Sequence, residues 1–323
     1  MTGSAPHPIN KNRSLQASFD MQANSSEFLQ RLSGAIEDAA RSASESVVTV
    51  ERDGRAGTGV VVDREGHILT ANHVVHHLEE TEVTTHDGRR LKARVLGRNP
   101  YADLALLAAD EDGLKPIDLG ESSALRVGQF VLALARPQPG SVGVTSGIVT
   151  GVNRQIGGWR RFSVRDAIVT DARLNPGYSG GPLVDASGRM IGMNVAYVMN
   201  RGIAVSADTI RRSLERMAKG EDVRRAHLGV VASPIELPDE VASRPDVGQE
   251  TALMVFSVEP GSGAKAAGIV LGDVLLRFGE QKLTDIQQLE GVLGEEAIGK
   301  KARMVVLRGE QLKEIEATPA ASG

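Results

Sequence analysis

The stretch NPGYSGGPLVD, residues 175–185, places three glycines and two prolines around a single serine, Ser179. The chain on both sides of it consists of short runs rich in β-branched residues, such as GTGVVVD (57–63) and QFVLALA (129–135). Glycine and proline interrupt strands and favour tight turns. The stretch therefore predicts an abrupt turn inside a β-rich region, with Ser179 at its centre.

Some ten runs of this kind follow one another between residues 46 and 206 without an intervening helical pattern, which is typical of an antiparallel barrel or sandwich. Asp87-Gly88 predicts a tight hairpin turn, and the segment 186–188 predicts a looser one. A helical pattern returns only at SADTIRRSLERMAKG, residues 206–220. A long β region closed by one helix indicates a complete domain.

The composition excludes several classes of protein. Of 323 residues, 41% are hydrophobic and 24% are charged, and no apolar run approaches the ~18 residues of a membrane helix, so we expect no transmembrane segment. A formal net charge of -4 without a long basic block argues against nucleic acid as a partner. The absence of cysteine excludes disulfides and thiolate chemistry.

The pattern along the chain predicts several segments in order. Residues 1–24 are polar and unpatterned and predict a disordered arm. Residues 25–45 predict a helix whose apolar stripe either docks on its own domain or contacts another subunit. A β-rich domain (46–220), a charged linker (221–227) and a small α+β domain (228–323) follow.

No secretory signal is evident in the first residues. The expected location is the cytoplasm if Met1 is the native start, and the periplasm or cell envelope if a leader was removed.

A serine hydroxyl becomes a good nucleophile only when a base takes its proton and an acid orients that base. His73 follows the strand-like run HILTA, and Asp103 stands immediately before the apolar run LALLAA. Asp110 and Asp112 are rivals for the acid, but they lie beyond that run. The order His73, Asp103, Ser179 is one of the known chain orders of this triad, the one associated with paired β-barrels.

The glycines around Ser179 fit the same chemistry. A tetrahedral intermediate needs backbone N–H groups aimed at its oxyanion, so the peptide before the serine must turn inward without obstruction. Gly177 tolerates the positive φ that such a turn requires. We therefore predict that the N–H groups of Gly177 and Ser179 form an oxyanion hole.

Metal and nucleotide sites are weaker interpretations. His73 and His77 are four residues apart, as metal ligands on a helix can be, but Val74 stands where a zinc peptidase needs its glutamate. GEEAIGKK (294–301) has the spacing of a phosphate-binding loop, but Lys301 replaces its serine or threonine. We expect no metal and no cofactor.

Three blocks of sequence, and two further segments beyond them, resemble one known family. They are GTGVVVDREGHILTANHVV (57–75), DLALL (103–107) and TDARLNPGYSGGPLVDASGRMIGMN (170–194), followed by HLGV (227–230) and PGSGAKAAGIVLGDVLL (260–276). The chain is similar in these blocks to the HtrA/Deg-type serine proteases, which are trypsin-like and carry a PDZ domain.

The resemblance implies a mainly β fold, with a chymotrypsin/trypsin-like double β-barrel protease domain followed by a small α+β PDZ domain. It also implies an ATP-independent serine endopeptidase that degrades unfolded or misfolded proteins and assembles as a homotrimer or a multiple of one. The implied S1 pocket residues are Leu174, Asn194, Val195 and Ala196. The PDZ residues implied to bind C-terminal or extended peptides are Leu228, Gly229 and Val230.

The sequence departs from the family at two places. Tyr178 stands where the family has asparagine, and Ala135-Arg136-Pro137 replaces a common Gly-Asn-Pro. Tyr178 keeps an alternative open, in which the protease half is silent and the protein is a PDZ-bearing chaperone that holds unfolded chains without cutting them.

Overall fold

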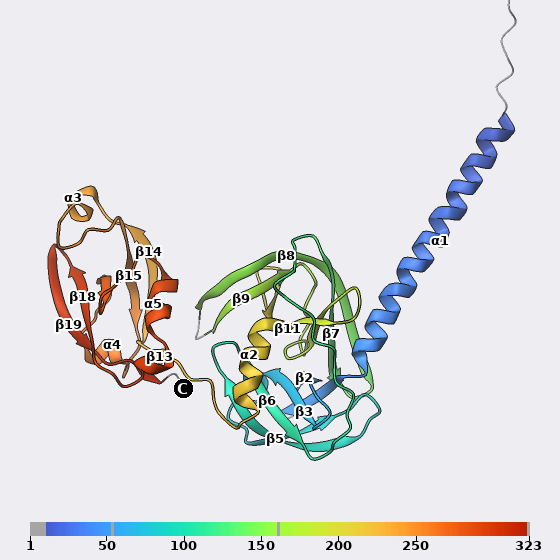
Figure 1. Cartoon of the computed structure of the whole chain (residues 1–323), viewed down its shortest axis with the longest axis horizontal. Coiled ribbons are helices and arrows are strands. Elements are labelled where there is room, and N and C mark those ends of the chain that lie inside the picture. Colours follow the sequence, from blue (N-terminus) through green and yellow to red (C-terminus); the bar gives the residue numbers. More distant parts are fainter. Residues whose placement is uncertain (1–10, 53–54, 160–161, 322–323) are drawn as a thin grey trace, which may run out of the picture.

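The computed structural model describes residues 11–52, 55–159 and 162–321. It consists of a long N-terminal helix, a β-rich unit and a smaller C-terminal unit (Figure 1). No helix within these ranges is both long and apolar enough to cross a membrane.

The β-rich unit contains two closed antiparallel barrels, which confirms the predicted mainly β, double-barrel fold. The first barrel has the order β1-β2-β3-β6-β5-β4, with strands β1 (Val47–Arg52), β2 (Arg55–Val61), β3 (His67–Ala71), β4 (Glu80–Thr84), β5 (Arg90–Asn99) and β6 (Leu104–Ala109). The second has the order β10-β11-β12-β9-β8-β7, with β7 (Phe130–Gln138), β8 (Ser141–Trp159), β9 (Phe162–Thr170), β10 (Pro182–Asp185), β11 (Met190–Val198) and β12 (Arg201–Ser206). Closure leaves neither sheet with a free edge.

The turns form where the sequence predicts them. Gly88 joins β4 to β5 with φ +87, and Gly188 joins β10 to β11 with φ +77. Glycine adopts this left-handed conformation without steric cost. These short connections keep neighbouring strands antiparallel.

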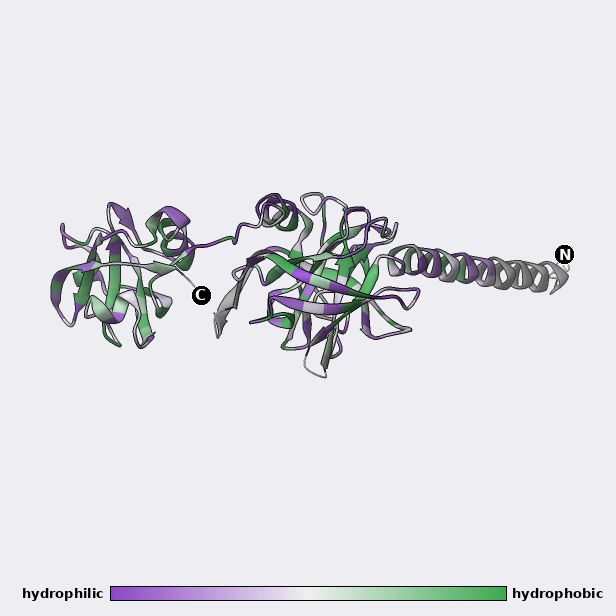
Figure 2. Ribbon diagram, turned by 90° about the horizontal axis from the view of Figure 1, so that it is seen from below, coloured by the Kyte–Doolittle hydropathy of each residue, from purple (hydrophilic) through white to green (hydrophobic). Residues whose placement is uncertain are grey.

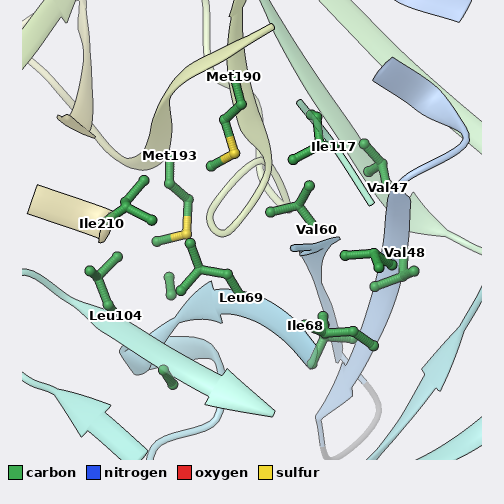
Figure 3. Close-up of a cluster of buried hydrophobic side chains, with 14 of the residues drawn as sticks. Val47, Val48, Val60, Ile68, Leu69, Leu104, Ile117, Met190, Met193 and Ile210 are labelled. Atoms are coloured by element: carbon green, nitrogen blue, oxygen red, sulfur yellow. The ribbon is translucent and has the colours of Figure 1, made fainter. Parts of the chain in front are cut away.

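The two barrels share one hydrophobic core, and this fixes their relative position. Met190 and Met193 on β11 of the second barrel lie close to Val60, Leu69 and Leu104 of the first (Figure 3). All five side chains are fully buried. Because burial of such side chains stabilises by about 1.5–3 kcal/mol each, the contact between the barrels is a substantial part of the stability of this unit.

The N-terminal helix α1 (Lys11–Ser44) begins earlier than the sequence predicts. The segment 11–24, expected to be disordered, belongs to the helix, and residues 1–10 lie outside the described residues. The sequence from 11 to 33 holds neither glycine nor proline, so nothing in it breaks a helix. The C-terminal end of α1 is anchored through the buried Ala39 and Ala43, and from there the helix leads away from the barrels (Figures 1 and 2).

Helix α2 (Ala207–Met217) forms as predicted and packs against both barrels, on β5 and β6 of the first and on β11 and β12 of the second. Ser206 is its N-cap and accepts a hydrogen bond from the Thr209 N–H, and Gly220 ends the segment with φ +75. Ile210 and Met217 are fully buried on the face toward the barrels.

The C-terminal unit is a six-stranded antiparallel sheet with short helices and its own hydrophobic core. Its elements are β13 (Ala226–His227), β14 (Val230–Glu236), α3 (Asp239–Ala242), β15 (Thr251–Val258), α4 (Gly263–Ala266), β16 (Val274–Phe278), β17 (Gln281–Lys282), α5 (Ile286–Val292), β18 (Ala302–Arg308), β19 (Gln311–Ala317) and β20 (Ala320–Ala321). In the order β14-β15-β16-β18-β19, strand β14 lies at the edge.

A buried ion pair stabilises this unit. Arg308 donates to both carboxylate oxygens of the fully buried Asp273, at 2.7 and 2.8 Å, and the Val270 N–H donates to Oδ2 at 2.9 Å. Burial raises the pKa of Asp273, but the hydrogen bonds and charge of Arg308 outweigh this effect and leave the pKa below its usual value.

We therefore expect Asp273→Asn to lower the free energy of unfolding of the C-terminal unit by about 1–3 kcal/mol, because the fully buried side chain at this position loses charge-assisted hydrogen bonds and places an NH₂ group against donors. Since the folded-state pKa is depressed, the stabilisation is fully present above the unfolded pKa of about 4 and is lost as the pH falls through the lower folded value. Hydrogen exchange of β16 and β18 in urea at several pH values measures both effects. Glu316→Gln, which breaks an exposed pair with Lys301, is the control and should change little.

Candidate active site

His73 and Asp103 are brought together by the pairing of two strands. Ala71, the last residue of β3, lies opposite Leu104, the first residue of β6. His73 follows β3 in the short 3₁₀ turn η1 (Asn72–Val74), and Asp103 immediately precedes β6. The antiparallel register therefore places the two residues side by side at one end of the first barrel.

Two hydrogen bonds fix the imidazole of His73 on Asp103. The backbone N–H of His73 donates to Oδ1 of Asp103 at 2.9 Å, and Nδ1 of the imidazole lies 2.5 Å from Oδ2. The Asp103 side chain is 8% exposed, whereas that of His73 is 49% exposed, so the acid is inside and the ring is accessible from solvent. Asp103 has φ +53, a conformation that aspartate tolerates better than most residues.

Ser179 belongs to the second barrel, but its turn lies against the first. The N–H of Thr58 on β2 donates to the Ser179 carbonyl oxygen at 3.1 Å. A Cβ added to Gly180 would lie 1.9 Å from the Thr58 carbonyl oxygen and 2.6 Å from Oγ1 of Thr70 on β3, three residues before His73. The Ser179 hydroxyl donates to the Val195 carbonyl oxygen at 3.3 Å. The serine turn thus packs against β2 and β3 of the first barrel, and β3 leads directly to His73.

The turn before Ser179 has the shape of an anion-binding site. Gly177 has φ +89, and its carbonyl oxygen accepts a hydrogen bond of 2.7 Å from the Thr58 hydroxyl. The Tyr178 N–H donates to the Asn175 carbonyl oxygen at 3.1 Å. Among the described residues, the N–H groups of Gly177 and Ser179 donate to no hydrogen-bond acceptor.

Tyr178 anchors this turn in the second barrel. Its side chain is 4% exposed and belongs to the core of that barrel. Burial raises the pKa of the phenol, although hydrogen bonds with Asn175 and Thr145 partly oppose the shift. A Cβ on Gly143 would lie 2.7 Å from the Tyr178 hydroxyl oxygen, so β8 leaves space for the ring. The bulky replacement points away from the serine and leaves its surroundings open.

The residues predicted for the S1 pocket differ in burial. Asn194 is fully buried, and its amide nitrogen donates to the Pro182 carbonyl oxygen at 3.1 Å. Its side chain therefore supports the serine turn from inside. Leu174 and Val195 are 8% and 3% exposed, and Ala196 is partly exposed.

The metal interpretation based on His73 and His77 fails on geometry. His73 lies in a three-residue 3₁₀ turn, and His77 lies in the following turn with φ +67, so the two are not one turn apart on an α-helix. Asp63, Glu65 and His67 place possible ligand atoms within 4.8 Å of one another, a grouping that the sequence does not suggest. However, Asp63 already accepts hydrogen bonds from the backbone N–H groups of the other two and contacts Nδ1 of His67.

In the C-terminal unit, the segment of Leu228 and Gly229 leads into the edge strand β14. The Leu228 and Gly229 carbonyl oxygens accept hydrogen bonds from Ala264 and Glu259, at 2.8 and 2.9 Å. Within the described part of the chain, the N–H groups of the same two residues donate to no acceptor. Helix α5 packs beside β14. The unit therefore offers a free strand edge that starts at two unpaired N–H groups.

The contributions of Thr58 and Arg136 are not evident from the sequence. Thr58 donates to Gly177 and accepts from the Arg136 N–H at 2.9 Å. Thr58 belongs to a strand-like run, where threonine is common, so the pattern gives no signal for this role. For Arg136 there is a signal, because Ala135-Arg136-Pro137 stands where the family commonly has Gly-Asn-Pro.

Two family models match the chain, one for each unit. The model described as a trypsin-like peptidase domain matches residues 57–193, and that of a PDZ domain matches residues 226–318. The periplasmic serine endoprotease DegP of Salmonella typhimurium is 33% identical over 260 residues, which cover 78% of this chain and 54% of the relative. DegP of Escherichia coli K12 is 32% identical over the same share. The chain thus spans about half the length of these curated relatives.

Solved structures of HtrA-type proteases match this chain over nearly the whole of their own length. An HtrA-type protease, AlgW with a decapeptide, is 27% identical with a TM-score of 0.67, covering 89% of this chain and 99% of that one. The serine endoprotease from Yersinia pestis is 26% identical with a TM-score of 0.65, covering 89% and 98%. The matches to a trypsin-like peptidase domain and a PDZ domain, and the similarity to DegP and to HtrA-type structures, agree with the double barrel, its His73–Asp103 pair and its GxSGGP turn. The chain belongs to the HtrA/Deg-type serine proteases.

Proposed function

We propose that the protein is a serine endopeptidase that cleaves peptide bonds by acyl transfer. Ser179 attacks the scissile carbonyl carbon while His73 takes its proton and then delivers it to the leaving amine. Asp103 holds the tautomer of the imidazole that leaves Nε2 unprotonated, and water subsequently hydrolyses the acyl-enzyme. The N–H groups of Gly177 and Ser179 stabilise the oxyanion.

One observation carries this proposal. The buried carboxylate of Asp103 contacts Nδ1 of His73 at 2.5 Å, and the adjoining turn presents N–H groups of Gly177 and Ser179 that have no partner among the described residues. Unpaired N–H groups are costly when they are shielded from water. Two such groups beside one serine therefore support a site that receives an oxyanion. The buried position of Tyr178 argues against the alternative of a silent protease half.

We also propose that the pocket beside Ser179 takes small apolar side chains. Leu174 and Ala196, with the backbone of Val195, would contact the residue before the cleaved bond. Small aliphatic residues fit because no charged group is among these three. The substrates would be unfolded proteins, since an extended chain is needed to reach Ser179 at the contact between the barrels.

Digestion of casein without ATP tests the function. We expect the full chain to degrade casein, and we expect a fluorophosphonate probe to label Ser179 stoichiometrically and to stop the digestion. Digestion that continues after complete labelling of Ser179 would reject this serine as the nucleophile. Absence of both labelling and digestion, together with suppressed aggregation of the casein, would favour the silent chaperone.

The PDZ domain is proposed to bind peptides that end in an apolar residue. The N–H groups of Leu228, Gly229 and Val230 would receive the terminal carboxylate, and the peptide would add to β14 as a further strand. Hydrogen bonds to a charged acceptor are roughly twice as strong as neutral ones, so the terminal charge contributes to the affinity.

We predict that replacing the free carboxylate of such a peptide by an amide weakens its binding about tenfold, which corresponds to about 1.4 kcal/mol. Fluorescence anisotropy with the full-length Ser179→Ala variant measures this without cleavage of the peptide. The same peptide with an internal scrambled sequence and a free apolar terminus is the control and should bind. Equal affinity of the acid and the amide would exclude this loop as a carboxylate site.

We also propose that the protein assembles as a homotrimer or a multiple of one. Phe28, Leu29 and Leu32 on α1 are 65%, 62% and 46% exposed, and apolar side chains gathered on a single helix favour contact with another subunit. The mass from light scattering tests this part separately from the catalytic chemistry.

A further inference from the structure

Arg136 is a buried cation without an acidic partner. It lies near the end of β7, is 5% exposed, and has no carboxylate at ion-pair distance among the described residues. Burial lowers the pKa of its guanidinium. A charge removed from water is costly unless the protein compensates for it, so the groups that contact this side chain are of interest.

Carbonyl groups at and just after the end of helix α1 replace the water that the Arg136 guanidinium has lost. Nε donates to the Val47 carbonyl oxygen at 2.9 Å, and Nη2 donates to the Ser44 carbonyl oxygen at 3.2 Å. Ser44 is the last residue of α1. The last carbonyl groups of a helix lack intrahelical partners and carry partial negative charge, so a cation there is favourable. The anchored end of the helix and Arg136 therefore stabilise each other.

The backbone of Arg136 is joined to the serine turn through one hydroxyl. Thr58 Oγ1 accepts from the Arg136 N–H at 2.9 Å and donates to the Gly177 carbonyl oxygen at 2.7 Å. On the other side, the Arg136 carbonyl oxygen accepts from the Thr49 hydroxyl at 2.9 Å. The next residue, Pro137, also touches Gly177, because a Cβ on that glycine would lie 2.5 Å from the proline Cβ.

These contacts hold the carbonyl group of Gly177 in one direction. The carbonyl group of Gly177 shares its peptide plane with the Tyr178 N–H, which donates to the Asn175 carbonyl oxygen at 3.1 Å. Both sides of this peptide are therefore held, and it lies between the two N–H groups proposed to bind the oxyanion, those of Gly177 and Ser179. A shift of the segment at residues 136–137 would allow Gly177 to relax and its N–H to turn away from the oxyanion position.

We propose that Arg136 is a positioning residue that couples the anchored end of α1 to the oxyanion turn, so that turnover depends on the helix. The inference rests on the proposed function, in which Ser179 is the nucleophile and Gly177 donates to the oxyanion. It extends that function, since it makes the N-terminal helix part of the regulation of catalysis.

The first test separates transition-state stabilisation from substrate binding. In the full chain, Arg136→Met is expected to lower kcat on a short chromogenic peptide by about 10–100-fold, somewhat less than the ~100–1000-fold effect of deleting an oxyanion donor. KM should stay within about threefold, because the substrate pocket is not altered. Arg136→Lys keeps the charge and one donor and should restore part of the loss. Circular dichroism identifies the temperature range in which every variant is folded.

Arg211→Met is the matched control for this test. Arg211 also donates to two backbone carbonyl oxygens, those of Leu119 and Gly120, but it joins α2 to a different loop. Its kcat should remain within about twofold of the wild-type value. A kcat of Arg136→Met within twofold of wild type, or a loss confined to KM, would overturn the proposal.

The second test addresses the helix. Ala43 is 2% exposed, so Ala43→Glu should detach the end of α1, and we expect kcat to fall about as far as in Arg136→Met. In the double variant the second change should add less than about threefold, because both act through one connection. Ser42→Glu places the same charge on an exposed neighbour and should have no effect. Ala43→Gly weakens the same turn without a buried charge and replaces Ala43→Glu if that variant does not fold.

Additive losses in the double variant would reject the coupling. Failure of the coupling is distinguishable from failure of the proposed function. If a fluorophosphonate does not label Ser179 in the wild-type chain, the catalytic assignment itself is wrong. If it labels wild type and Arg136→Met at the same rate, only the role of Arg136 is excluded.

Discussion

Replacing Ser179 by alanine is expected to lower kcat on the order of 10⁶-fold, the size seen when the nucleophile of a Ser-His-Asp triad is removed. The His73–Asp103 pair and the oxyanion donors cannot form an acyl-enzyme without the hydroxyl. The fold should persist, because the Ser179 hydroxyl makes one long hydrogen bond, 3.3 Å, to the Val195 carbonyl oxygen. Cleavage of casein and of a chromogenic peptide measures the loss.

Ser187→Ala is the control for this variant. Ser187 lies in the exposed turn between β10 and β11, close in sequence but outside the proposed site. Its activity should equal that of wild type. The Ser179→Ala protein should also bind apolar C-terminal peptides as before. Casein digestion at an unchanged rate by Ser179→Ala would remove this residue from the mechanism.

Asp103→Asn is expected to lower kcat on the order of 10⁴-fold while the fold is retained. The backbone N–H of His73 donates to Oδ1 at 2.9 Å, so an asparagine would keep its carbonyl oxygen there and turn its NH₂ group toward Nδ1. An NH₂ donor at Nδ1 favours the tautomer with the proton on Nε2. The imidazole could then no longer accept the proton of Ser179.

The measurement for this variant is the pH dependence of kcat on the chromogenic peptide. Asp110→Asn is the matched control, because Asp110 is the nearest rival acid in the sequence and is exposed. We expect its kcat to stay within about twofold of wild type. A large loss in Asp110→Asn together with a small one in Asp103→Asn would reverse the assignment of the acid.

The architecture could be predicted because the strands carry local signals. Alternating and β-branched runs, together with turns at Gly88 and Gly188, define antiparallel strands without any knowledge of distant contacts. The positions of His73 and Asp103 at strand ends are also local signals, but their proximity depends on the pairing of β3 with β6, which are not consecutive along the chain.

Other parts of the site could not be predicted, because they depend on side chains that meet across the barrels. Thr58 and Arg136 are 78 positions apart and are joined by one hydrogen bond. The orientation of Asn194 is decided by the carbonyl of Pro182, which lies beneath the serine turn. The early start of α1 has another cause: residues 11–33 contain neither glycine nor proline, so the sequence holds no strong signal for where the helix begins.

The division of the proposed site between the barrels affects the order in which it is completed during synthesis. His73 and Asp103 belong to the first barrel, whereas Ser179 reaches its place only when β7 to β12 have closed and docked. A nascent chain on the ribosome therefore holds the base and its acid well before the nucleophile. The proposed site therefore stays incomplete until translation has passed the second barrel, so the fold itself sets the point at which the nucleophile joins its base.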